Sequence, residues 1–374
     1  MTGPRRRLAA LRVLSGALKG ERSMPSVPSG AGLRASDGAW RDTLELAREL
    51  SLGPALWGAI HDVRDDIPRD VAEELHRSHL LNAVRNARLR SALIEAVQAL
   101  NDAGVVPMLF KGALALVDGT HGAMGGRWMV DLDVLVATND MPVARRTLER
   151  LGYVAEPGRP FLHPHELPFV RERSSAVIEL HNELGSEPIP SILPARAAWA
   201  ASVGVAVGDG QARAPAPTHQ VLHNVLHAAV QDLNHSVGGL PLRQLIALER
   251  LVRRHGDAID WTSIRERMED HGLGRAQRDH LWLAHRYAGM MLPEERRGLG
   301  SRIHEARVVA NFALVWPADV QRNLRFAFGR AYLDSLYGHR DRRLRLLAAR
   351  VRHGASILRR DGRRVLDDVL ARRG

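Results

Sequence analysis

The hydrophobic and polar positions of residues 40–101 follow the three- and four-residue spacing of amphipathic helices. Two apolar helix faces are expected here, the first with Leu44, Leu46, Ala47 and Leu50, the second with Leu80, Leu81, Val84 and Leu89. Pro68 suits the first turn of a long helix, because that turn needs no backbone N–H donor. Residues 38–103 are therefore predicted to form an N-terminal helical region.

From residue 104 the pattern changes to short apolar or alternating runs, which are typical of strands. Strands are expected at residues 105–110, 131–136, 152–154, 167–171 and 176–181. Helices are expected between them at residues 113–117 and 142–151, with a glycine-rich loop at 119–126. Alternating strands and helices predict an α/β-type core, which we place at residues 104–185.

After residue 185 the pattern becomes helical again. Helices are expected at residues 218–233, 242–255, 261–271 and 276–291, followed by arginine-rich helical stretches to residue 370. Residues 186–374 are thus predicted to be a C-terminal helical domain. Residues 1–37, rich in Gly, Ser, Pro and Arg, are predicted to be a flexible basic tail with a short helix near residues 8–18. The expected class is α+β, with a small core flanked by helical domains.

The composition of the chain excludes some kinds of binding site and argues against a membrane protein. The 374 residues include no cysteine, so disulfides and thiolate metal sites are excluded. No apolar run approaches the ~20 residues that cross a membrane, and Arg12 and Lys19 interrupt the apolar stretch near the N-terminus. We therefore expect a cytoplasmic protein with no membrane partner.

The formal net charge is +11, and almost all of the positive charge is arginine, because Lys19 and Lys111 are the two lysines of the chain. A basic surface can attract nucleotides or nucleic acid, whereas an arginine-rich coding bias would give the same charge without a partner. Aromatic residues make up only 5% of the chain, and no basic stripe interleaved with aromatics is present for base stacking. Nucleic acid is a possible partner but not the favoured one.

Two aspartates begin the expected strand at residues 131–136. The two-residue period of a strand places Asp131 and Asp133 on one face and Leu132 on the other. Two close carboxylates repel each other, and a Mg²⁺-like ion with hard oxygen ligands relieves that repulsion. A solvated strand end carrying two acids is the alternative, and for such a short motif taken alone it is the better interpretation.

Other residues strengthen the metal interpretation. Glu179 and His181 share one face of the later alternating strand, and a neighbouring strand could bring Glu179 beside the aspartates. Three carboxylates can hold one or two metal ions that orient nucleotide phosphates. His181 would support the metal or relay a proton.

A strand-to-helix turn and one arginine supply candidate phosphate contacts. Gly112 would let the backbone approach a phosphate, and Lys111 and Arg127 would add positive charge. The alternatives are a plain turn glycine with an exposed lysine, and a surface arginine.

Together these residues resemble the uncharacterised nucleotidyltransferases of the DNA polymerase beta superfamily. The matching motifs are Leu109-Phe110-Lys111-Gly112-Ala113, Arg127, Asp131-Leu132-Asp133-Val134-Leu135-Val136, Leu151-Gly152-Tyr153 and Ile178-Glu179-Leu180-His181, with similar flanks at residues 40–50 and 260–261. The resemblance implies a small mixed-sheet nucleotidyltransferase core. It implies that Asp131 and Asp133 bind Mg²⁺ or Mn²⁺, that Glu179 is the third carboxylate and serves as ligand or base, and that Gly112 lies against the NTP phosphates.

Two features depart from the family's pattern. Ala113 follows Gly112 where a serine or a second glycine is usual, so Lys111 would have to replace a hydroxyl contact. The loop at residues 122–126 is unusually rich in glycine, which suits either a mobile lid or a copy that has lost catalysis.

Histidines form a second pattern. His219, His223 and His227 recur every four residues and so share one helix face, which we expect to line a cleft between the core and the C-terminal helices. A zinc site there is less favoured, because no acid in register completes it. His163 and His165 are weaker candidates for substrate contact, and the arginines of residues 340–352 for an anionic partner.

The leading hypothesis is a metal-dependent nucleotidyltransferase that moves a nucleoside monophosphate from an NTP to a hydroxyl or phosphate of an acceptor. The acceptor could be a small molecule, a peptide or RNA. The alternative is a non-catalytic regulatory protein on the same fold that binds nucleotide or nucleic acid. A toxin- or antitoxin-like role through nucleotidylation is a third possibility.

Overall fold

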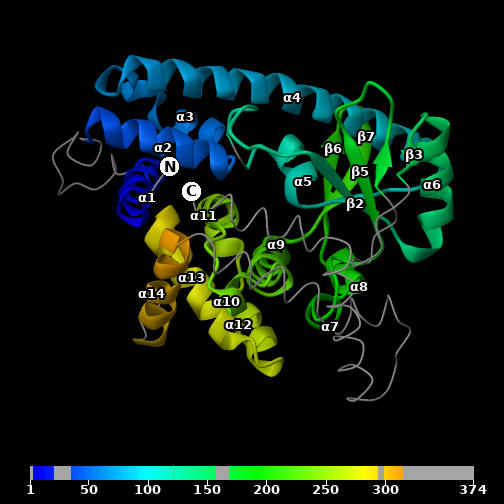
Figure 1. The fold of residues 1–374 in the computed structure, drawn as a ribbon. Coiled ribbons are helices and arrows are strands. Elements are labelled where there is room, and N and C mark those ends of the chain that lie inside the picture. The colour runs from blue at the N-terminus through cyan, green and yellow to red at the C-terminus, as the bar shows by residue number, and fades with distance from the viewer. Residues whose placement is uncertain (1–2, 21–34, 121, 157–167, 294–298, 315–374) are drawn as a thin grey trace, which may run out of the picture. The chain divides into compact units, whose positions relative to one another are not determined.

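The computed structural model describes residues 3–20, 35–120, 122–156, 168–293 and 299–314 (Figure 1). His163, His165 and the arginine-rich stretches beyond residue 314 lie outside the described residues. None of the described helices is both long and apolar enough to cross a membrane. The domain boundaries expected at residues 103/104 and 185/186 remain predictions.

Helices form the N-terminal part. They are α1 (Pro4–Leu18), α2 (Asp37–Glu49), α3 (Gly53–Ile60), a 3-10 turn (His61–Asp66) and α4 (Arg69–Asp102). Ser36 caps α2 by accepting a hydrogen bond from the backbone N–H of Ala39. Helix α4 begins directly after Pro68, as the sequence predicted.

The short helix expected near residues 8–18 is present as α1, which begins earlier, at Pro4, and is packed rather than part of a flexible tail. Its buried residues include Ala10, Leu11 and Leu14, whose helical spacing gives the segment a face for the hydrophobic core. Arg7 is also buried, and its Nε donates to the backbone oxygen of Phe312, 2.9 Å away. Residues 4–18 are therefore an integral, packed helix.

The second apolar face expected on α4 is wrong at three of its four positions. Leu80, Leu81 and Val84 are exposed, with 52%, 62% and 54% of their surface accessible, whereas Leu89 is buried as predicted. Asn82 and Asn86 are buried instead. Both amides face the glycine-rich loop, because the carbonyl groups of that loop need hydrogen-bond donors. Leu80, Leu81 and Val84 therefore point toward solvent.

A seven-stranded mixed sheet forms the core, in the order β3-β4-β5-β2-β1-β7-β6. The strands are β1 (Met108–Leu109), β2 (Asp131–Leu135), β3 (Val154–Ala155), β4 (Phe169–Val170), β5 (Val177–His181), β6 (Val203–Val207) and β7 (Gly210–Ala214). The pairs β2–β5 and β1–β7 are parallel, and the other pairs are antiparallel. The predicted α+β class with a mixed sheet and flanking helices is confirmed.

The β6–β7 hairpin corrects the expectation that only helices follow residue 185. Residues 203–207 alternate around glycine and valine, and Gly208-Asp209 makes the tight turn, with Gly208 at φ +62°. That sequence is a hairpin signal. Strand β7 pairs with β1 through Met108 and Arg213, so the region after residue 185 completes the sheet.

Further helices lie beside the sheet or pack on one another. They are α5 (Lys111–Asp118), α6 (Met141–Arg150), α7 (Ile189–Ile192), α8 (Ala195–Ala200), α9 (Pro217–Val225) with a π-helical continuation (Leu226–Gln231), α10 (Asn234–Val237), α11 (Leu242–His255), α12 (Trp261–Asp270), α13 (Gly274–Ala288) and α14 (Leu299–Leu314). The bounds of α11 are those expected from its pattern.

The two faces of the sheet belong to two hydrophobic cores. Leu132, Val134 and Ile178 pack with residues 89–100 of α4 in one core. Phe110 and Leu135 pack with the N-terminal and C-terminal helices in the other. Figure 1 shows α4 extending from α2 and α3 to the sheet. The predicted catalytic carboxylates lie on the second face, toward the C-terminal helices.

Candidate functional site

The parallel pairing of β2 and β5 brings the predicted acids together. Asp133 is opposite Glu179 in the ladder, and paired residues point to the same face. His181 Nε2 lies 3.2 Å from Asp133 Oδ1 and 3.7 Å from Glu179 Oε2. One possible ligand atom from each of the three residues lies within 4.8 Å of the other two. We call Asp133, Glu179 and His181 the strand cluster.

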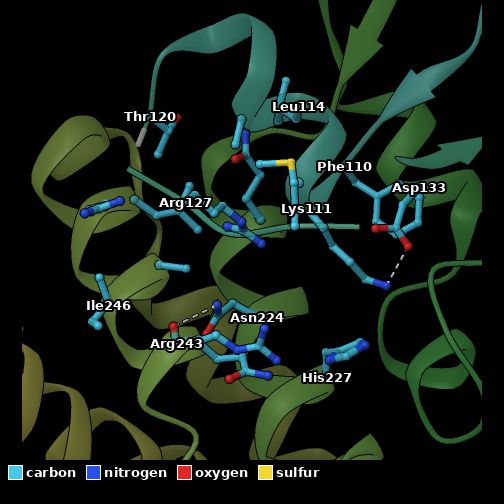
Figure 2. Close-up of a pocket in the computed structure, with 18 of the residues that line it drawn as sticks. Phe110, Lys111, Leu114, Thr120, Arg127, Asp133, Asn224, His227, Arg243 and Ile246 are labelled. Carbon is cyan, nitrogen blue, oxygen red and sulfur yellow. Dashed lines mark hydrogen bonds and ion pairs between the residues drawn. The ribbon is translucent and has the colours of Figure 1, made fainter. Parts of the chain in front are cut away.

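Lys111 lies at the start of α5 and reaches the same carboxylate. Its Nζ donates to Asp133 Oδ1 at 2.8 Å, as Figure 2 shows. Its backbone is in the left-handed region at φ +50°, which is unfavourable for a residue with a side chain. This strained turn directs the Lys111 ammonium toward Asp133. The lysine is therefore not the exposed surface residue of the alternative interpretation.

Gly112 follows in a close approach to the sheet. A Cβ atom there would lie 3.3 Å from Met129 Sδ and 3.8 Å from the backbone oxygen of Asp131. The glycine therefore lets the first turn of α5 pack against the chain that leads into β2.

Electrostatics keep the strand cluster charged. Burial alone would raise the pKa of Asp133, but Lys111 and His181 outweigh it and hold that pKa below its usual range. Burial opposes the charged forms of Lys111 and His181, yet the neighbouring carboxylates raise the pKa of both. The site thus pairs an ionised carboxylate with an ammonium and with an imidazole whose protonated form is favoured by its neighbours.

Asp131 behaves differently from Asp133. Burial, Asp133 and Glu179 all raise the pKa of Asp131, and Lys111 only partly opposes them. Asp131 is half-buried and does not belong to the close strand cluster. Of Asp131 and Asp133, Asp131 is the carboxylate whose ionised form a bound cation would stabilise more.

A cavity of about 340 Å³ adjoins these residues (Figure 2). The core contributes Lys111, Gly112, Arg127, Asp131 and Asp133 to its lining, and the C-terminal helices contribute His219, His223, His227, Arg243 and Arg250. The expectation that the histidine face of residues 219–227 lines this cleft is confirmed. Glu179 and His181 are not among the lining residues.

Arginines make the cavity strongly basic. Burial, together with the charges of Arg250 and Arg243, lowers the pKa of Arg127 to about 10 against the opposing pull of Asp133. Burial also lowers the pKa of Arg250. Close guanidinium groups in a confined space favour an anionic occupant. The sequence pattern did not identify Arg243 and Arg250, because only the tertiary fold brings α11 to the core.

The glycine-rich loop before β2 is held by α4. Asn82 Nδ2 donates to the backbone oxygens of Gly125 and Arg127 at 2.8 Å each. Asn86 Nδ2 donates to the backbone oxygens of Met124 and Arg127 at 2.7 Å each. Asn82 and Asn86 are thus positioning residues for Arg127, and they too were missed from the sequence.

Gly125 shows why this loop needs glycine. A Cβ atom there would lie 2.5 Å from His79 Nε2, closer than real contacts allow. The loop packs directly onto α4, which favours a fixed support for Arg127 over a mobile lid.

Burial on the helical side favours the neutral form of two histidines, His223 and His219. Burial lowers the pKa of His223 to about 3, and its Nε2 lies 2.8 Å from the backbone oxygen of Leu184. Burial also lowers the pKa of His219. Among the described residues, His219, His223 and His227 do not form a group of three converging metal ligands.

The residues present fit a hard divalent cation. The two carboxylates of the strand cluster supply oxygen ligands that Mg²⁺ and Mn²⁺ prefer. The imidazole of His181 is more compatible with Mn²⁺ than with Mg²⁺. Because Lys111 holds Asp133 Oδ1, an ion bound to that oxygen requires the lysine to move away.

Comparison with known proteins identifies the family of this chain. No curated protein and no solved structure matches the chain. A model of the family described as uncharacterised nucleotidyltransferase matches residues 36–289, more than half of the chain. The chain therefore belongs to the uncharacterised nucleotidyltransferase family.

Proposed function

We propose that this protein transfers a nucleoside monophosphate from an NTP to a hydroxyl or phosphate of an acceptor, with Mg²⁺ or Mn²⁺ as cofactor. One observation carries the proposal. The in-register pair Asp133 and Glu179 lies beside a cavity whose walls hold Lys111, Arg127 and Arg243. Acids for a metal and cations for a polyphosphate are the two requirements of this chemistry.

The basic residues would bind the triphosphate. Arg127 is fixed through its backbone by Asn82 and Asn86, so its guanidinium meets the phosphates with little loss of entropy. Gly112 permits close approach of the α5 N-terminus, where backbone N–H groups favour an anion. Lys111 can exchange its carboxylate partner for a phosphate oxygen, which compensates for the missing hydroxyl at Ala113.

The carboxylates would hold the cation and take up the proton. Asp131, Asp133 and Glu179 are the proposed ligands, and the bound ion would neutralise phosphate charge and orient the α-phosphorus. The acceptor oxygen forms a bond to that phosphorus while the bond to the pyrophosphate oxygen breaks. Glu179 accepts the acceptor's proton. His181, close to both Asp133 and Glu179, would orient the latter.

Label transfer tests the proposal. The purified protein is incubated with each α-³²P-labelled NTP, Mn²⁺ or Mg²⁺ and a cell extract, and the labelled product is identified as small molecule, peptide or RNA. Asp131→Asn is the inactive reference, and Asp209→Asn, an exposed carboxylate in the β6–β7 turn, is the matched control. Labelling that is equal in the wild type and Asp131→Asn would refute the proposed site.

The second candidate is a non-catalytic protein that binds nucleotide or nucleic acid on the same fold. The Lys111–Asp133 ion pair favours it, because an ammonium already neutralises the carboxylate that a metal would need. Calorimetry with ATP separates the candidates. Binding that ignores Mg²⁺ and Mn²⁺ supports the non-catalytic protein, and binding that strengthens with either ion supports the transferase.

A further inference from the structure

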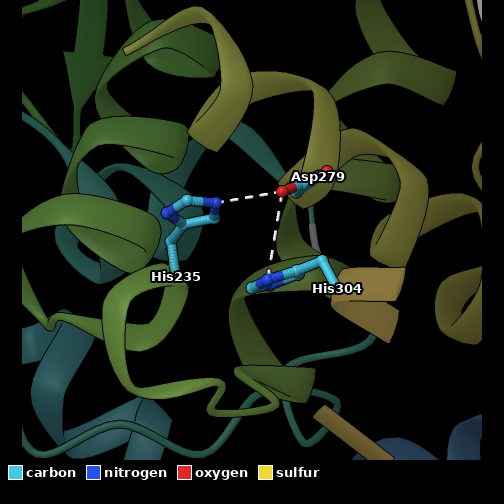
Figure 3. Close-up of side chains that lie close together, drawn as sticks. All are labelled: His235, Asp279 and His304. Atoms are coloured by element: carbon cyan, nitrogen blue, oxygen red, sulfur yellow. Dashed lines mark hydrogen bonds and ion pairs between the residues drawn. The ribbon is translucent and has the colours of Figure 1, made fainter. Parts of the chain in front are cut away.

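Three residues far from the strand cluster also converge. His235 of α10, Asp279 of α13 and His304 of α14 direct their side chains toward one point (Figure 3). His235 Nε2 lies 3.0 Å from Asp279 Oδ2, and His304 Nδ1 lies 3.9 Å from the same oxygen. We call these residues the helix cluster. None of them lines the cavity described above.

The carboxylate at the centre is buried and oriented. Only 2% of the Asp279 side chain is accessible, and Ser301 Oγ donates to Asp279 Oδ1 at 2.7 Å. That bond fixes the carboxylate so that Oδ2 faces both imidazoles. Hydrogen bonds of this kind are the usual support of a metal-ligating carboxylate.

The two imidazoles of the helix cluster lie face to face. The rings of His235 and His304 stack with centroids 4.7 Å apart and planes 24° from parallel, an arrangement that disfavours two protonated rings. A metal ion requires neutral imidazole nitrogens.

We propose that His235 Nε2, Asp279 Oδ2 and His304 Nδ1 form a zinc site, with water at the fourth position. Ligand atoms about 2.0–2.1 Å from a tetrahedral Zn²⁺ are about 3.3 Å apart. The observed separations of 3.0 and 3.9 Å from Asp279 Oδ2 bracket that value. The stacked imidazoles must also turn out of their parallel arrangement, so that the ring-plane lone pairs of both nitrogens point at the ion. Two imidazoles and one carboxylate suit Zn²⁺ better than Mg²⁺.

One neighbouring cation must give way. Arg275 Nε lies 3.6 Å from Asp279 Oδ2, but 66% of the arginine side chain is accessible, so it can turn into solvent. The zinc ion would then join α14 to α13 and α10. Ser301 and His304 lie beyond residue 289, where the family match ends. His235 and Asp279 lie within the matched range, so the site joins a segment beyond the family match to the matched part of the chain.

Metal binding to the full-length protein tests the site. After treatment with a chelator, Zn²⁺ affinity is measured by calorimetry, and Co²⁺ is added as a visible probe of tetrahedral coordination. We expect one tight site in the wild type, at least about 100-fold weaker binding in His304→Ala and His235→Ala, and about 10- to 100-fold weaker binding in Ser301→Ala. His271→Ala, at the end of α12, is the matched control and should bind as the wild type does.

Asp133→Asn separates this site from the strand cluster. Retention of the tight Zn²⁺ site and of the Co²⁺ spectrum in Asp133→Asn supports the proposal. Loss of both in Asp133→Asn with retention in His304→Ala overturns it. Equal Zn²⁺ affinity in the wild type and both histidine variants, with circular dichroism showing all three folded, overturns it as well and leaves the helix cluster as an ion-pair contact.

Discussion

The strand cluster and the helix cluster use the same residue types in opposite proportions. Each has a carboxylate with 2% of its side chain accessible, Asp133 in one and Asp279 in the other. Yet the pKa of His181 is raised above its usual value, whereas the pKa of His304 falls to about 4. Two carboxylates outweigh burial around His181, and one carboxylate shared by two rings does not outweigh it around His304.

The ratio of carboxylates to imidazoles therefore sets both the charge of a cluster and the cation that it prefers. The strand cluster is rich in oxygen, which favours a hard ion such as Mg²⁺ or Mn²⁺. The helix cluster is rich in nitrogen and favours a resident Zn²⁺.

Asp131→Asn and Asp133→Asn should separate activity from stability within one strand. Both should reduce label transfer at least about 100-fold, because loss of a direct metal ligand exceeds the effect of losing its supporting contacts.

Asp131→Asn should leave the fold as stable as the wild type or more so, because repulsion already raises the pKa of that carboxyl. Asp133→Asn should destabilise, because it removes the partner of Lys111. Transfer assays and urea unfolding at pH 7.5 measure both. Equal stability changes in the two variants would contradict the assigned asymmetry.

Lys111→Ala tests the ammonium of the strand cluster. Removing it should lower the free energy of unfolding by about 3 kcal/mol, because it leaves a buried carboxylate with one cationic partner fewer. Urea unfolding measures the change, and Asp209→Asn, in the exposed β6–β7 turn, should change it by less than about 0.5 kcal/mol. If the Lys111→Ala protein is as stable as the wild type, the ion pair between Lys111 and Asp133 does not stabilise the fold.

Manganese should stabilise through the strand cluster alone. At 100 times its Kd, Mn²⁺ should raise the free energy of unfolding of the chelator-treated protein by about 2.7 kcal/mol. The gain should disappear in Asp133→Asn and persist in His304→Ala, as followed by urea unfolding. If the gain persists in Asp133→Asn and disappears in His304→Ala, Mn²⁺ binds to the helix cluster and not to the strand cluster.

His223 should make stability depend on pH on the helical side of the cavity. Its pKa is about 3 in the folded state and about 6.5 in the unfolded chain, so the unfolded state binds more protons between these values. Stability is therefore full above pH 6.5 and is lost as the pH falls toward 3, by up to about 1.4 kcal/mol per pH unit. His223→Gln should flatten the slope of urea-unfolding free energy between pH 7 and 5. An unchanged slope would contradict the neutral, buried state of this ring.

The sequence predicted what depends on local periodicity. The alternation at residues 131–135 and 177–181 placed Asp133 and Glu179 on matching faces, and the helical spacing gave α11 its bounds. It also anticipated that the histidines of residues 219–227 face a cleft. Each of these follows from a two- or 3.6-residue repeat within one element.

What failed depends on contacts between distant segments. Leu80 and Leu81 have an apolar pattern, but the loop carbonyls that select the buried face of α4 lie more than 40 residues away, at Gly125 and Arg127. The helix cluster is built from three helices whose relative placement no local pattern encodes. The roles assigned to individual site residues remain predictions.

Helix α4 has a consequence for how the protein unfolds. At 34 residues it is about 50 Å long, and it contributes Val71 and Leu75 to one hydrophobic core and residues 89–100 to the other. A shared continuous helix couples the two cores, because melting either one exposes part of the same element. The described N-terminal, sheet and C-terminal segments should therefore unfold in one cooperative transition, and a weakness introduced at either end of α4 should be felt at the other.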